Sequence, residues 1–154
     1  MQTQRLKKID WSSWVIGTSL VLVTLSIAHL LQDFAYGIPA RLGISMIEAL
    51  IVLGGFYAIQ VITILLAAAE HKEGYLGSLV FGIIWLIAAL ADVGGILVAW
   101  PHGGLLFNAL VIGVILSALA VIVCSVAAWR AHSVPAARRP IGFQVERTSR
   151  WHGA

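Results

Sequence analysis

The sequence places a few ionisable residues inside long apolar stretches, where a charge is costly. Three acids lie in or at the edge of such stretches, namely Asp33, Glu48 and Asp92. A charge at the centre of a membrane helix costs about 2.5–3.5 kcal/mol, so such residues usually face a bundle interior and serve a function. His29 and Asp33 are four residues apart and share one helical face. A carboxylate beside an imidazole fixes its tautomer and favours its charged form, which makes these two residues a tuning dyad.

We expect Glu48 and Asp92 to act as an acid–base pair. Burial of two neighbouring carboxyls favours a protonated one that can donate a proton, while a group kept ionised by His29 accepts one. Such a pair could protonate an alkene of an isoprenoid or sterol and remove another proton, which is double-bond isomerisation or cyclisation. That chemistry requires no metal and no cofactor. The sequence leaves open whether the protein is an enzyme.

The depth of these residues indicates one shared pocket. A helix rises about 1.5 Å per residue. By that rise, His29, Glu48, Asp92 and Asn108 lie roughly 6–12 Å inside the outer ends of their apolar stretches. We therefore predict a polar pocket that opens toward the outer leaflet, in which Asn108 positions the substrate. Trp85 precedes Asp92 by seven residues on the same face and would form an aromatic wall.

Each of these assignments has a structural alternative. The two acids could form a pair that only joins helices, and Asp33 could simply end its helix in water. Asn108 and Trp85 could serve ordinary helix packing.

The composition restricts the class of protein. The chain has 154 residues, of which 60% are hydrophobic and 11% are charged. Soluble domains have about 45–50% apolar and about 25% charged residues. The mean hydropathy is +0.94. These values exclude a soluble enzyme, a disordered chain and a secreted disulfide scaffold, and leave an integral membrane protein. Cys124 is the single cysteine, so an internal disulfide and a metal site built from cysteine pairs are excluded.

Four segments are long enough to cross a bilayer, which requires about 20 apolar residues each. They are Trp14–Leu31, about Leu42–Ala69, Leu76–Ala99 and Leu105–Trp129. The connections are short, so sequential helices are expected to be antiparallel neighbours. We predict an all-α, antiparallel four-helix membrane bundle over residues 14–130, preceded by a cytoplasmic segment, 1–13, and followed by a basic cytoplasmic tail, 131–154.

The basic residues indicate the orientation. Nine of the ten Lys and Arg residues lie in the N-terminal segment, the second connection and the tail, and only Arg41 lies on the other side. By the positive-inside rule both termini are predicted to be cytoplasmic, in the inner membrane of a cell. The orientation in the membrane therefore explains the net charge of +3, and we do not expect nucleic acid as a partner.

The order of the polar residues resembles the EXPERA group, the emopamil-binding and sterol isomerase-like membrane proteins. The matching positions are His29-Leu-Leu-Gln-Asp33, Glu48, Asp92 and Asn108-Ala-Leu, within residues 26–125. The resemblance implies a lipid-facing cavity surrounded by these side chains. A competing resemblance to DoxX-like four-helix proteins rests on the stretch from Ile47 to Gly55, in which Glu48 precedes two glycines, and implies no particular enzymatic role.

Two alternatives to a lipid isomerase follow from other features. Intramembrane acids are also typical of proton-coupled carriers, and a non-catalytic binder of small molecules or lipids would need the same pocket. His29 and His102 on the outer side, with His71 and His132 on the inner side, could hold haem b. However, His71, His102 and His132 have the setting of solvated interface residues. A bundle this small could also form a homodimer.

Overall fold

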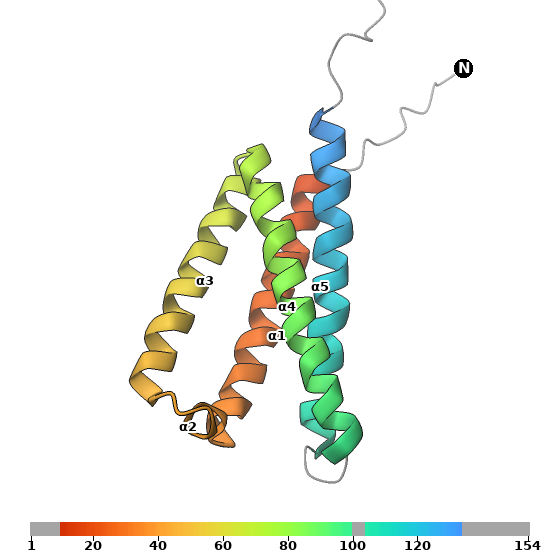
Figure 1. Cartoon of the computed structure of the whole chain (residues 1–154). Helices are drawn as coiled ribbons and strands as arrows, with labels where there is room; N and C mark the ends of the chain where they lie inside the picture. Colours follow the sequence, from red (N-terminus) through yellow and green to blue (C-terminus); the bar gives the residue numbers. More distant parts are fainter. Residues whose placement is uncertain (1–9, 100–103, 134–154) are drawn as a thin grey trace, which may run out of the picture.

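The computed structural model describes residues 10–99 and 104–133, and they form helices joined by short turns (Figure 1). The four long helices are α1 (Trp11–Ala35), α3 (Met46–Ala68), α4 (Lys72–Ala99) and α5 (Gly104–Ser133), and α2 (Ile38–Arg41) is a single turn. Each long helix contains a stretch that is long and apolar enough to cross a membrane. The predicted all-helical chain with four candidate spans is therefore confirmed for the described residues.

The outer bounds of the bundle differ slightly from the sequence prediction. Helix α1 begins at Trp11, three residues early, because the Asp10 side chain accepts hydrogen bonds from the backbone N–H and the hydroxyl of Ser13. Helix α5 continues to Ser133, so the tail is helical over its first three residues. The rest of the predicted terminal segments, residues 1–9 and 134–154, lies outside the described residues.

The second span begins at Met46, so the predicted start near Leu42 is wrong. Gly37 and Gly43 have φ values of 69° and 72° and bracket the single turn of α2. This left-handed conformation suits glycine, which has no Cβ atom. Ser45 then caps α3 and forms a capping box with Glu48. The residues between Gly37 and Ser45 therefore form a connection at the end of α1 rather than the first turns of a span.

Helices α1, α4 and α5 form the packed part of the bundle, with α5 in contact with both of the others. Their core contains Leu22, Trp85, Ala89, Val114, Ala118 and Val121. Gly82 faces Ala118, Val121 and Ile122 of α5, so its missing side chain allows α4 and α5 to approach closely. At the end where α1 begins, the buried Tyr75 hydroxyl lies 2.6 Å from Ser12 Oγ and 3.1 Å from His132 Nε2, which joins α1, α4 and α5.

A tight turn joins α3 to α4. The backbone N–H of His71 donates to the Leu66 carbonyl and that of Glu70 to the Ala67 carbonyl, which is the Schellman pattern. Glu70 occupies the left-handed position of this turn with φ 58°. A Cβ atom at Gly74 would overlap the Leu66–Ala67 backbone, and one at Gly77 would overlap Thr63. The missing side chains of these two glycines therefore allow the C-terminal half of α3 to pack closely against α4.

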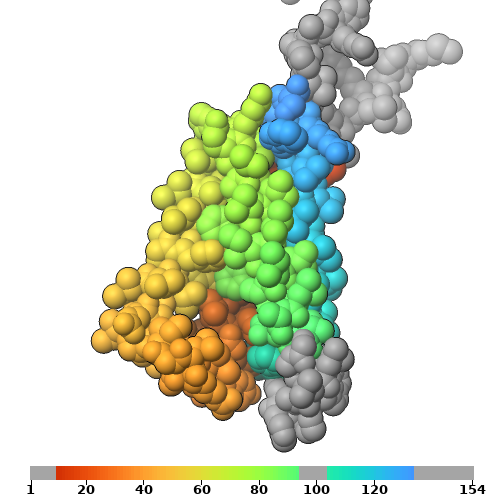
Figure 2. Space-filling model, viewed as in Figure 1, coloured from red at the N-terminus to blue at the C-terminus, as the bar shows by residue number. Residues whose placement is uncertain are grey.

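The N-terminal half of α3 is not packed in this way. The buried residues of α3 are Gln60, Thr63, Ile64 and Ala67, all in its C-terminal half. A Cβ atom at Gly54 or Gly55 would meet nothing within 4 Å. Figure 1 shows α3 leaning away from α1 and α4 toward α2, and Figure 2 shows a hollow where α1 is visible between α2–α3 and α4. The space at this end of the bundle is where the candidate site lies.

Candidate functional site

Three ionisable side chains from two helices meet near the C-terminal end of α1. His29 Nε2 lies 2.9 Å from Asp92 Oδ2 on α4 and 3.8 Å from Asp33 Oδ2, one turn further along α1. The i, i+4 spacing of His29 and Asp33 therefore gives the shared face that the sequence predicts. The contact with Asp92 is new, because the sequence pairs this acid with Glu48 instead.

His29 is the buried centre of this cluster. Its relative exposure is 3%, and the ring of Phe107 on α5 packs on it with 5.3 Å between centroids. The Nδ1 atom is buried and has no hydrogen-bond partner among the described residues. When the imidazole is neutral and donates from Nε2 to Asp92, Nδ1 is an acceptor, and when it is charged both nitrogens are donors. The His29 ring can thus exchange a proton on the side that faces the carboxylates.

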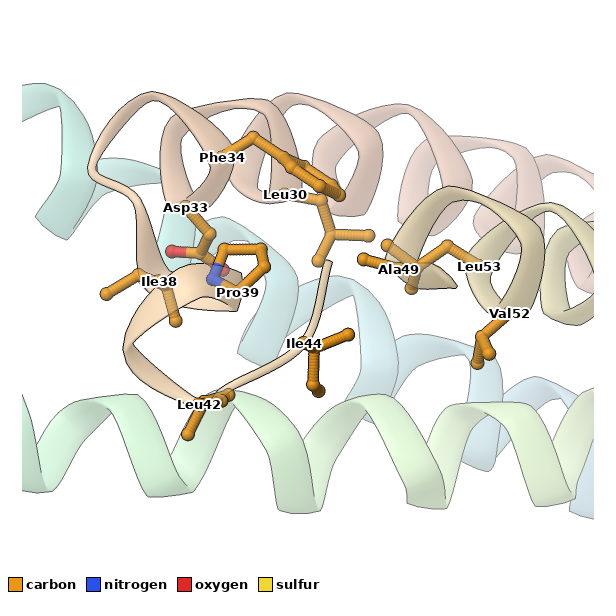
Figure 3. Close-up of a pocket in the computed structure, with 10 residues that line it drawn as sticks. All are labelled: Leu30, Asp33, Phe34, Ile38, Pro39, Leu42, Ile44, Ala49, Val52 and Leu53. Atoms are coloured by element: carbon orange, nitrogen blue, oxygen red, sulfur yellow. The ribbon is translucent and has the colours of Figure 1, made fainter. Parts of the chain in front are cut away.

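A cavity of about 310 Å³ lies next to this cluster, between α1, α2, the following loop and α3. Its lining residues are Leu30, Asp33, Phe34, Ile38, Pro39, Leu42, Ile44, Ala49, Val52 and Leu53. Figure 3 shows the Asp33 carboxyl beside Ile38 and Pro39, whereas Leu30 lies close to Ala49. Nine of the ten lining residues are apolar, so Asp33 is the single ionisable group of this lining. The volume lies at the low end of the range for small-molecule sites.

Glu48 does not join this cluster, and the expected pair of Glu48 with Asp92 does not form. The Glu48 side chain is exposed and accepts a hydrogen bond of 2.9 Å from the Ser45 backbone N–H, while the Ser45 hydroxyl accepts one of 3.2 Å from Glu48 N–H. Glu48 is the third residue of α3 and therefore lies at the end of the helix rather than within it. The physical reason is local, because the capping box satisfies backbone groups that the helix itself leaves free.

Trp85 lies in the core and does not line the cavity. It is 6% exposed, and its indole N–H donates a hydrogen bond of 3.3 Å to Gln60 Oε1 on α3. Phe56 and Tyr57 pack on it at 5.7 and 5.9 Å between centroids. Trp85 therefore does not form an aromatic wall of this cavity. Its surroundings correspond to the alternative role, ordinary helix packing.

Asn108 is half-buried, does not line the cavity, and its side chain makes no hydrogen bond within the described part of the chain. Its neighbour Phe107 contacts His29 instead. The predicted role of Asn108 as a polar positioner therefore has no support in this geometry.

The residues around His29 and Asp33 that the sequence does not indicate are mostly apolar. Phe107 and the aliphatic lining carry no chemical signature, so only their three-dimensional position identifies them. The capping role of Glu48 is different, since Ser45-Met-Ile-Glu48 has the spacing of a capping box and signals a helix start.

A metal centre finds no support in the described residues. No group of three or more His, Cys, Asp or Glu side chains there is arranged to hold a metal ion. His132 lies at the opposite end of the bundle with Tyr75, and His102 is outside the described residues.

Comparison with protein-family models, with curated proteins and with solved structures found no match to this chain.

Proposed function

We propose that this integral membrane protein binds a hydrophobic small molecule of isoprenoid or sterol type in the cavity between α1, α2 and α3. The observation that carries the proposal is Asp33, the single ionisable residue of an apolar lining, whose carboxyl lies 3.8 Å from the buried His29 Nε2. Predominantly apolar pockets with one or a few placed polar groups are typical of small-molecule sites.

The same cluster supports acid–base chemistry on such a ligand. A protonated Asp33 donates its proton to one alkene carbon, and the resulting cation loses a proton from a neighbouring carbon to the regenerated carboxylate. The double bond has then moved and no atom has been gained or lost, so the reaction is an isomerisation. Asp33 is then protonated again, and His29 and Asp92 would exchange this proton with solvent between turnovers. Compared with the sequence-based hypothesis, this assignment replaces Glu48 by Asp33 as the group that meets the ligand.

Non-catalytic binding is the second candidate, and the aliphatic lining favours it equally. Isomerisation and binding without catalysis are distinguished by incubating the protein with farnesol in deuterated water. An isomerase incorporates deuterium into the recovered alkenes, and Asp33→Asn stops incorporation. A pure binder retains farnesol without exchange.

Binding itself is tested by mass spectrometry of the lipids that copurify with the protein. Ala49 lines the cavity, so Ala49→Trp fills it, whereas Ala58→Trp adds the same bulk to an exposed position of the same helix. We expect a lipid that is present in the wild type and in Ala58→Trp and is depleted in Ala49→Trp. Equal lipid content in all three proteins would contradict the proposal.

We infer further that the helices cross the inner membrane in antiparallel order with both termini in the cytoplasm. The support is the position of the basic residues, nine of which fall on one side. A green fluorescent protein fused to the C-terminus should therefore fluoresce, and alkaline phosphatase fused there should be inactive. The reverse pattern would place the tail outside.

A further inference from the structure

The imidazole of His29 stands between two carboxyls with different surroundings. The same atom, Nε2, is 2.9 Å from Asp92 Oδ2 and 3.8 Å from Asp33 Oδ2. Asp33 lines the cavity, and Asp92 does not. The Asp92 side chain is 38% exposed, whereas that of Asp33 is 21% exposed and that of His29 is 4% exposed. A buried nitrogen therefore connects the acid that lines the cavity with a more exposed acid on α4.

We propose that Asp92, His29 and Asp33 form a proton relay between α4 and the cavity. The inference rests on the proposed function for the cavity end, because it takes the cavity as the ligand site. Its consequence is that occupation of the cavity next to Asp33 is linked to the exchange of a proton at Asp92.

The transfer balances without a further reactant. The relay starts from the neutral ring whose proton is on Nδ1, so that Nε2 is the acceptor. In the first step the O–H bond of a protonated Asp92 breaks and an N–H bond forms at Nε2, which leaves a carboxylate and an imidazolium. In the second step that N–H bond breaks and an O–H bond forms at Asp33. The net change is one proton moved from Asp92 to Asp33, and the ring returns to its neutral form. A small reorientation of the Asp33 side chain or of the ring closes the longer of the two distances.

The remaining neighbours of His29 are compatible with such a relay. Phe107 packs on the ring from α5, and Tyr36 packs on Phe107 at 6.5 Å between centroids. Among the described residues, Asp33 and Asp92 are the charged partners of His29. The acid of α3, Glu48, is bound to Ser45 and is exposed. The proton therefore has one buried acceptor between the two acids.

The relay is tested first without any ligand, so that its failure is distinct from failure of the proposed function. Wild-type protein in lipid nanodiscs is exposed to a rapid drop in pH, and protonation of carboxyls is followed by the C=O infrared band. Asp33→Asn identifies the Asp33 band. In Asp92→Asn we expect Asp33 to protonate about a hundredfold more slowly, as for loss of a positioned proton donor. Glu48→Gln is the control, because it removes a carboxyl at the same end of the bundle and leaves the relay intact.

His29→Gln tests the residue in the middle of the proposed relay. It should slow protonation of Asp33 to the same degree as Asp92→Asn, and the double variant should be no slower than either single variant. Circular dichroism and size-exclusion chromatography establish that each variant is folded. The proposal is overturned if Asp33 protonates at the same rate in Asp92→Asn and Glu48→Gln. It is also overturned if Asp33 is never protonated over the pH range in which the protein is folded.

The link to the cavity is then tested with farnesol as the probe. Addition of farnesol to wild-type protein in weakly buffered solution should change the bulk proton concentration, and Ala49→Trp should abolish the change. In Asp92→Asn the proton exchange should slow while farnesol is retained. Proton exchange that is equally fast in Asp92→Asn and wild type would overturn the assignment of Asp92 as the proton donor of the relay.

Discussion

His29 on α1 and Asp92 on α4 are 63 positions apart in the chain, and their side chains meet with 2.9 Å between Nε2 and Oδ2. This contact joins two of the three closely packed helices at the end where α3 leans away. It also determines which nitrogen of the imidazole faces the carboxyls. The cavity lined by Asp33 lies next to this pair.

The contact between His29 and Asp92 should stabilise the bundle measurably. Interhelical hydrogen bonds in membrane proteins contribute about 0.6 kcal/mol on average and about 1.7 kcal/mol at most. A double-mutant cycle with His29→Phe and Asp92→Ala, measured by unfolding in increasing fractions of sodium dodecyl sulfate, should therefore give a coupling free energy of about 1 kcal/mol. Additive effects of the two substitutions would show that the pair does not interact.

Gly77 should tolerate no larger residue while Thr63 faces it. A Cβ atom there would overlap Thr63 Cγ2, and the Thr63 hydroxyl is bound at 2.7 Å to the Gln60 carbonyl. Gly77→Ala should therefore lower the free energy of unfolding by about 1–3 kcal/mol, as expected for overpacking. Thr63→Ser removes the overlapping methyl group and should restore much of this loss in the double variant. Gly17→Ala is the matched control, because nothing lies within 4 Å of a Cβ at that helical position.

The turn between α3 and α4 carries strain that one substitution should relieve. Glu70 has φ 58°. This left-handed conformation disfavours residues with a Cβ atom. Glu70→Gly should raise the free energy of unfolding by about 0.5–1 kcal/mol, seen as a higher midpoint of thermal unfolding in detergent. A lower midpoint would indicate that the Glu70 side chain contributes a stabilising contact.

The first turn of α1 should weaken in acid. Hydrogen bonds from the Ser13 hydroxyl and backbone hold the pKa of Asp10 below its ordinary value. A carboxyl with a lowered pKa in the folded state contributes stability above its unfolded pKa of about 3.9, and this contribution is lost as the pH falls through the folded pKa. Hydrogen exchange at the start of α1, measured relative to the middle of α1, should therefore become less protected below about pH 4. In Asp10→Asn this dependence should vanish.

The sequence predicts the helices well because hydropathy over about 20 residues is a strong signal. It fails at the start of α3, where Leu42 is apolar but Gly43 and the capping box of Ser45 and Glu48 end the connection. Local hydrogen bonds to the backbone determine the position of Glu48, and a hydropathy profile does not detect such bonds. The spacing of Ser45 and Glu48 would have revealed it.

One contact of the candidate site, between His29 and Asp33, could be predicted from the sequence. The pairing of His29 with Asp33 follows from helical geometry, which spacing alone defines. The acid of another helix that contacts His29 depends on the orientation of α4 about its axis relative to α1. This orientation depends on core packing, to which Trp85 and Val114 contribute. Spacing within one helix carries no such information. The lining of the cavity is apolar, as lipid-facing surfaces are. The sequence alone therefore does not distinguish lining residues from lipid-facing residues.

Photolabelling in membranes tests most directly whether the cavity beside Asp33 binds a ligand. A farnesol analogue bearing a diazirine is activated in membranes that contain wild-type protein, and the labelled peptides are mapped by mass spectrometry. We predict labels concentrated on lining residues such as Leu30, Val52 and Leu53, which Ala49→Trp removes and Ala58→Trp retains. Labels spread evenly over the lipid-facing surfaces of all four long helices, and unchanged in Ala49→Trp, would contradict a ligand site beside Asp33.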